Sequence, residues 1–68
     1  MPLKIRKLKS MLRKAGFTRR SGKGSHTVWE HPRIPDERVV LSGRDGDDAK
    51  DYQTKQVREA VRKAELRE

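Results

Sequence analysis

Residues 21–29 read SGKGSHTVW, in which a glycine-rich turn leads directly into a short run of strand-forming residues. Gly22 and Gly24 allow the chain to reverse tightly. Thr27, Val28 and Trp29 favour an extended strand after the reversal. The stretch therefore predicts a β-hairpin with a first strand over 17–20, a turn over 21–24 and a second strand over 25–31.

The segments on either side of this hairpin predict two helices and a third strand. Apolar residues recur at helical spacing over 3–15, where Gly16 ends the pattern, and again from about Tyr52 onward. Residues 38–42 (RVVLS) are typical of a strand, whereas 32–37 and 43–48 are expected to be loops. Because short connections join the strands, we expect an α+β fold of order α-β-β-β-α, with a three-stranded antiparallel sheet and both helices on one face.

The chain has 68 residues, so a single domain over 1–68 is expected, and its positive charge is concentrated in the first half. Residues 1–33 contain ten Lys or Arg and only one acidic residue, Glu30, whereas residues 34–68 are nearly balanced. So uneven a surplus indicates a polyanionic partner, and nucleic acid is the commonest polyanion in a cell.

Several other classes of protein and site are disfavoured by the composition. No apolar stretch is long enough to span a membrane, and the absence of cysteine excludes disulfides and agrees with a cytoplasmic location. Two histidines without cysteine make a poor zinc site. The acidic loop 45–48 has no carboxylate where a calcium loop needs its last ligand. We therefore expect no metal and no cofactor.

His26 is the residue best placed for chemistry. It follows the predicted turn, and an imidazole accepts or donates a proton near neutral pH. The turn adds positive charge and backbone N–H groups that suit a phosphate. These groups would allow a base to take the proton of a ribose 2′-hydroxyl while cations stabilise the attacked phosphate. The predicted RNA-binding residues are Arg6, Lys9, Arg13, Arg19, Arg20, Gly22, Lys23, Gly24 and Ser25. From the spacing alone, an ordinary hairpin with a half-exposed histidine stays an open alternative.

Two further side chains have structural and functional interpretations. His31 lies five positions after His26, so regular alternation would place it on the opposite sheet face, in a structural or solvated role. Trp29 is expected in the core rather than stacked on an unpaired base. In that case His26 would lie on the open face of the sheet, within reach of RNA.

The sequence resembles the HicA toxin family. The resemblance is carried by AGF at 15–17, by KGSHTVWEHP at 23–32 and by the strand and helix over 39–61, and the KGSH block is its most specific part. It implies a fold similar to double-stranded-RNA-binding domains, cleavage of messenger RNA, and inhibition by a HicB-type antitoxin. It also implies that the family's catalytic histidine falls on His26 and its glycine on Gly24.

The chain departs from the commoner pattern of that family after the third strand. Many members have PVH there and GT at the start of the last helix, whereas this chain reads LSGRDG at 41–46 and DYQ at 51–53. Without a second histidine, the leaving 5′-oxygen is expected to take its proton from water. The leading hypothesis is thus a metal-independent endoribonuclease toxin with His26 as its single catalytic histidine. The alternatives are a non-catalytic basic RNA-binding module and a protein that binds only an acidic partner protein.

Overall fold

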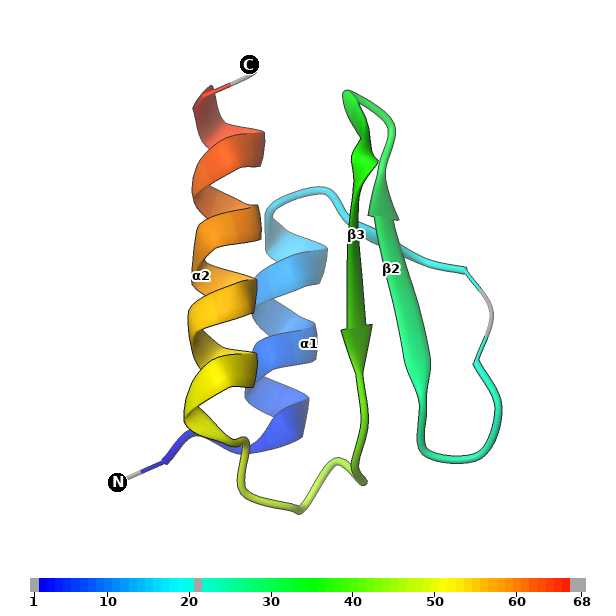
Figure 1. The fold of residues 1–68 in the computed structure, drawn as a ribbon, viewed down its shortest axis with the longest axis vertical. Helices are drawn as coiled ribbons and strands as arrows, with labels where there is room; N and C mark the ends of the chain where they lie inside the picture. Colours follow the sequence, from blue (N-terminus) through cyan, green and yellow to red (C-terminus); the bar gives the residue numbers. More distant parts are fainter. Residues whose placement is uncertain (1, 21, 67–68) are drawn as a thin grey trace.

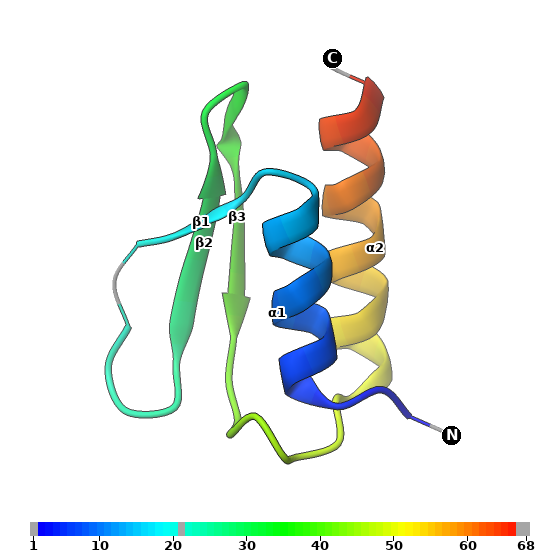
Figure 2. The same ribbon diagram turned by 180° about the vertical axis from the view of Figure 1, so that it is seen from behind.

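The computed structural model describes residues 2–20 and 22–66, which form two helices and one antiparallel sheet (Figure 1). The elements are α1 (Ile5–Lys14), β1 (Thr18–Arg19), β2 (Thr27–His31), β3 (Ile34–Leu41) and α2 (Asp51–Leu66). The strands lie in the order β1-β2-β3, and Figures 1 and 2 show both helices on the same side of the sheet. The predicted α-β-β-β-α architecture is confirmed, and the arrangement is consistent with a double-stranded-RNA-binding-domain-like fold.

The strand boundaries differ from the predicted ones in two places. Ile34–Glu37 was expected in a loop but forms the first half of β3, so the connection from β2 is a turn of only Pro32 and Arg33. A register irregularity between Glu30 and His31 brings His31 opposite Ile34. That irregularity, together with the proline and the acidic residues at 35–37, breaks the alternation by which a strand is recognised in sequence.

The hairpin predicted at 17–31 is also looser than expected. β1 has only two residues and β2 begins at Thr27, so Arg20 and residues 22–26 lie outside both strands. The part of the predicted turn at residue 21 lies outside the described residues. The segment that carries His26 is therefore a loop that leads into the start of β2 rather than a tight hairpin turn.

The core lies between the helices and the covered face of the sheet. Trp29 is fully buried at its centre, as expected, and its indole Nε1 donates a hydrogen bond to Thr27 Oγ1 at 2.9 Å. The other buried apolar residues are Ile5, Leu8, Leu12, Phe17, Ile34, Val39, Leu41, Ala49, Val57, Ala60 and Ala64. On the other face of the sheet Val40 is 45% exposed. One face of the sheet is thus covered and the other is open.

The two ends of α1 are completed in different ways. At the end, Gly16 has φ 97°, and the N–H groups of Gly16 and Phe17 donate to the carbonyls of Arg13 and Leu12, a Schellman motif. At the start no side chain caps the helix. Instead, the N–H groups of Ile5 and Arg6 donate to carbonyl oxygens of the loop between β3 and α2, at 2.9 and 3.1 Å. The acidic loop therefore supports α1 as well as leading into α2.

Candidate active site

His26 is exposed and lies immediately before β2. Its backbone N–H donates to the carbonyl oxygen of Lys23 at 3.1 Å, which closes a turn at Gly24 and Ser25. Gly24 has φ 63°, in the left-handed region that favours glycine. In Figures 1 and 2 this loop projects beside the sheet, away from both helices. The imidazole therefore stands on a segment that an extended polymer can approach.

Gly22 matters for its close backbone packing and not only for the conformational freedom of glycine. A Cβ at this position would collide with the backbone carbonyl oxygen of His26 and would lie 3.2 Å from Thr27 Cα. The backbone of Gly22 thus lies directly against the backbone that carries His26. Within the described residues, the N–H groups of Gly22, Lys23, Gly24 and Ser25 form no backbone–backbone hydrogen bond. The same short loop therefore holds the backbone of His26 and presents donors that an anion can use.

The cations near this loop differ in whether a carboxylate already pairs with them. Arg19 and Lys23 are exposed and take part in none of the ion pairs that residues 2–20 and 22–66 form. Arg20 Nε lies 3.1 Å from Glu30 Oε1, so part of its charge is already neutralised. Thr18 pairs with Glu30 and Arg19 with Trp29, so Arg19 and Arg20 extend to opposite faces of the sheet.

Three of the predicted RNA-binding residues, Arg6, Lys9 and Arg13, lie on α1 and are called its basic row; they are not all available to a ligand. Arg6 and Arg13 are exposed, and the Arg13 guanidinium lies 5.3 Å from the centre of the Trp29 ring. Lys9 Nζ lies 2.6 Å from Asp45 Oδ1, and only 12% of the Lys9 side chain is exposed. Because these residues lie on α1, the row belongs to the helical layer, whereas the His26 loop projects beside the sheet (Figure 2).

Two acidic residues that interact with predicted RNA-binding cations were not singled out from the sequence for that role. Asp45 contacts Lys9 across 36 positions, and Glu30 contacts both Arg20 and Arg38. Only the strand pairing and the loop docking reveal these contacts. The one usable signal was that Glu30 is the single acidic residue among the first 33.

His31 is a structural histidine. Its Nδ1 accepts the backbone N–H of Arg33 at 3.1 Å, and its Nε2 lies 3.0 Å from the carbonyl oxygen of Ala15. Since a carbonyl only accepts, Nε2 carries the proton and both ring nitrogens are engaged. The ring also meets Phe17 edge-on, with centroids 5.1 Å apart. It joins the end of α1 to the turn between β2 and β3, which confirms the structural role.

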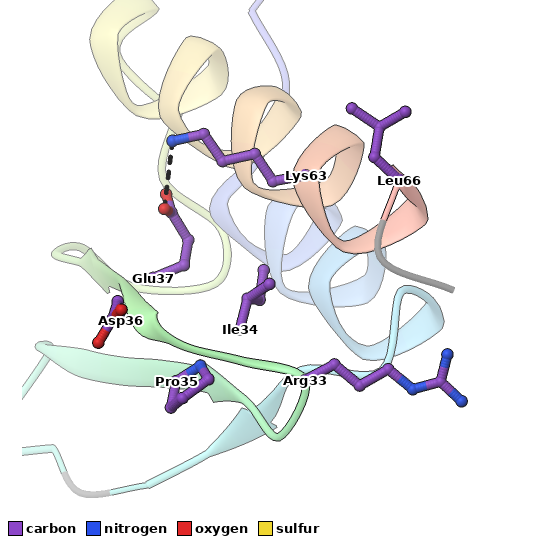
Figure 3. Close-up of a pocket in the computed structure, with 7 residues that line it drawn as sticks. All are labelled: Arg33, Ile34, Pro35, Asp36, Glu37, Lys63 and Leu66. Atoms are coloured by element: carbon purple, nitrogen blue, oxygen red, sulfur yellow. Dashed lines mark hydrogen bonds and ion pairs between the residues drawn. The ribbon is translucent and has the colours of Figure 1, made fainter.

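The cleft drawn in Figure 3 is separate from the candidate site. It has a volume of about 370 Å³ and lies between the start of β3 and the end of α2. It is lined by Arg33, Ile34, Pro35, Asp36, Glu37, Lys63 and Leu66. Across it, Lys63 Nζ and Glu37 Oε2 form an ion pair at 3.2 Å. His26 lies at the other end of the β2–β3 hairpin, so the cleft contributes nothing to its surroundings.

Within the described part of the chain, no three His, Cys, Asp or Glu side chains gather closely enough to hold a metal ion. Neither α1 nor α2 has the length and apolar character needed to cross a membrane.

Comparison with known proteins gives one assignment. The family model described as the HicA toxin of bacterial toxin–antitoxin systems matches residues 5–66, from the start of α1 to the end of α2. No curated protein and no solved structure matches the chain. The match spans every helix and strand described above, including the loop that carries His26. The chain therefore belongs to the HicA toxin family and is the toxin of a toxin–antitoxin system.

Proposed function

We propose that this HicA toxin is an endoribonuclease that cleaves messenger RNA, with His26 as its general base. The observation that supports this most directly is the position of His26, which is exposed on a projecting loop and whose backbone is held by the Lys23 carbonyl and the packing of Gly22. A catalytic group needs both access to the substrate and a defined position. His31 has a defined position but no access to substrate, because it is buried and its two ring nitrogens are occupied.

The proposed reaction requires a base, an internal nucleophile and positive charge. His26 takes the proton from a ribose 2′-hydroxyl, and the 2′-oxygen attacks the adjacent phosphorus. The bond from phosphorus to the 5′-oxygen then breaks, and water protonates the leaving oxygen. The products are a 2′,3′-cyclic phosphate and a 5′-hydroxyl end. The chain supplies only one histidine at this place, so no second imidazole is assigned as the acid.

The charge that develops on the phosphate is stabilised by groups of the same loop. Lys23 is exposed, and across residues 2–20 and 22–66 it has no partner carboxylate and the loop N–H groups have no backbone acceptor. Such donors act at the reacting phosphate. Arg19, Arg20 and the α1 row bind neighbouring phosphates without reading the bases. Arg20 does so with less charge, because Glu30 pairs with it.

The experiment compares wild type with His26→Ala on an end-labelled transcript, with chelator in both reactions. We expect cleavage to fall by about 100-fold or more, the usual contribution of a general base. RNA binding and the melting temperature should change little. Unchanged cleavage by His26→Ala would remove this residue from the mechanism.

A second substrate tests the nucleophile. A transcript with a single 2′-deoxyribose at the mapped cleavage position lacks the attacking oxygen and should stay intact there, while other positions are still cut. Cleavage at the modified position would contradict the proposed reaction.

The same assays separate the two alternatives. A non-catalytic RNA-binding module would bind RNA with a steep dependence on salt and leave it intact over hours. A protein that binds only an acidic partner would show negligible RNA affinity at physiological salt. The uneven charge of the chain favours the first alternative over the second, because the surplus lies on α1 and around the His26 loop.

The family membership implies an antitoxin partner, and we infer that this partner is of the HicB type. Because the His26 loop projects from the fold, a protein that covers it would block the substrate without altering the core (Figure 1). Coexpression with a HicB-type antitoxin should give a stable complex that lacks cleavage activity. Full activity of that complex would contradict inhibition at this loop.

A further inference from the structure

A carboxylate of the same chain lies against the basic row of α1. Asp45, in the loop between β3 and α2, places its Oδ1 2.6 Å from Lys9 Nζ. The Asp45 side chain is 64% exposed, whereas Lys9 is only 12% exposed. The carboxylate thus lies on the outer side of the ammonium group, where a ligand from solvent would approach.

The backbone holds this carboxylate in place. The Asp45 carbonyl oxygen accepts the N–H of Arg6 at 3.1 Å, and the Asp47 carbonyl accepts the N–H of Ile5 at 2.9 Å. Asp47 Oδ2 also accepts the N–H of Arg44 at 2.9 Å. Since the loop is bonded to the first turn of α1, Asp45 stays beside Lys9 unless its side chain rotates away.

The two arginines of the row act on the same carboxylate. The pKa of Asp45 is lowered chiefly by the hydrogen bond from Lys9 and by its charge, with smaller contributions from Arg13 and Arg6. The Arg13 guanidinium is itself held over the Trp29 ring at 5.3 Å. Lys9 thus contacts the carboxylate directly, while Arg13 and Arg6 act on it more weakly through their charges, and such a basic surface also suits a phosphodiester.

We propose that the Asp45 carboxylate occupies a phosphate-binding position centred on Lys9, in the basic row of α1, and so weakens the binding of RNA along this helix. A carboxylate and a phosphodiester are both singly charged oxyanions, and the Lys9 ammonium cannot serve both fully at once. RNA on this surface must displace the side chain of Asp45. The link to RNA rests on the proposed function, whereas the phosphate position itself does not.

The test uses Asp45→Asn, which preserves the size of the side chain and the backbone carbonyl that holds α1. Its control is Asp48→Asn, which changes the net charge equally in the same loop but pairs with Lys4, outside the row, at 2.6 Å. Binding is measured with a labelled, fully 2′-O-methylated RNA, which lacks the attacking hydroxyl and is not cleaved. A short inorganic polyphosphate serves as a second probe.

We expect Asp45→Asn to bind the RNA several-fold more tightly than Asp48→Asn. One additional phosphate contact should steepen the dependence of log K on log salt by about 0.7, the increment for single strands. The gain should disappear when Asp45→Asn is made in a Lys9→Gln background. Melting temperatures of all variants establish that the differences arise in folded protein.

The outcomes distinguish this inference from the proposed function. Equal gains for Asp45→Asn and Asp48→Asn, with RNA binding and cleavage intact, would overturn the inference and leave the ribonuclease standing. If no variant binds RNA but Asp45→Asn gains affinity for polyphosphate over its control, the phosphate position is supported and the RNA function fails. A gain that persists without Lys9 would also contradict the inference.

Discussion

Two histidines five positions apart have opposite surroundings. His26 is exposed on a loop, whereas His31 is 8% exposed and uses both ring nitrogens. The alternation rule predicted that they would differ, but neither environment follows from alternation alone. His26 lies outside the strand, and His31 lies at a register irregularity. Their placement depends on partners that the local sequence does not show.

Replacing His31 should therefore affect stability rather than chemistry. His31→Ala leaves the carbonyl of Ala15 and the N–H of Arg33 without their partner, at a cost of about 2–4 kcal/mol. For a domain of this size that corresponds to roughly 4–8 °C in melting temperature per kcal/mol. Thermal unfolding by circular dichroism measures the loss. A melting temperature equal to that of wild type would contradict the bridging role.

Gly22 should be needed for activity although it carries no reactive group. In Gly22→Ala the new Cβ would collide with the His26 carbonyl, so the loop has to shift. A displacement of about 1 Å can cost on the order of 100-fold in rate, and we expect a loss of tenfold or more in RNA cleavage. Gly46→Ala is the control, since a Cβ there meets open space. Equal activities of the two variants would show that the packing of Gly22 does not position His26.

At the scale of elements, sequence patterns succeeded where the signal is local. The helical periodicity and Gly16 placed α1 within two residues of its bounds, because a Schellman motif depends on neighbouring residues. The start of β3 was missed because its pairing partner, rather than its own pattern, makes it a strand. The docking of the acidic loop on α1 was missed because it joins residues about 40 positions apart.

The contact between that loop and α1 should contribute to the acid sensitivity of the fold. Lys9 holds the pKa of Asp45 below its ordinary value of 3.8, so the unfolded chain takes up the proton more readily. The contribution of Asp45 to stability is therefore complete above that value and is lost as the pH falls through the lower folded-state pKa. Melting temperatures at about pH 5 and about pH 3 should differ less for Asp45→Asn than for wild type. An identical difference in both proteins would contradict this contact.

At the scale of the whole molecule, the core is small enough that single truncations matter. Leu8 is fully buried between the layers, and Leu8→Ala should cost about 2–5 kcal/mol of unfolding free energy. That is comparable to the total stability of a small domain with few apolar residues. Chemical denaturation measures the change. Leu66→Ala is the control, because Leu66 is 75% exposed and its truncation should be nearly neutral.

The absence of a side-chain cap on α1 has a consequence for how the protein is made. The first N–H groups of this ten-residue helix are satisfied by carbonyls of Asp45 and Asp47, and its apolar stripe is covered partly by α2. A helix this short is unstable alone in water. On the ribosome, the basic half of the chain leaves the exit tunnel before the segment that completes it. We therefore expect α1 to stay incomplete on the ribosome until residues 45–66 have also been translated.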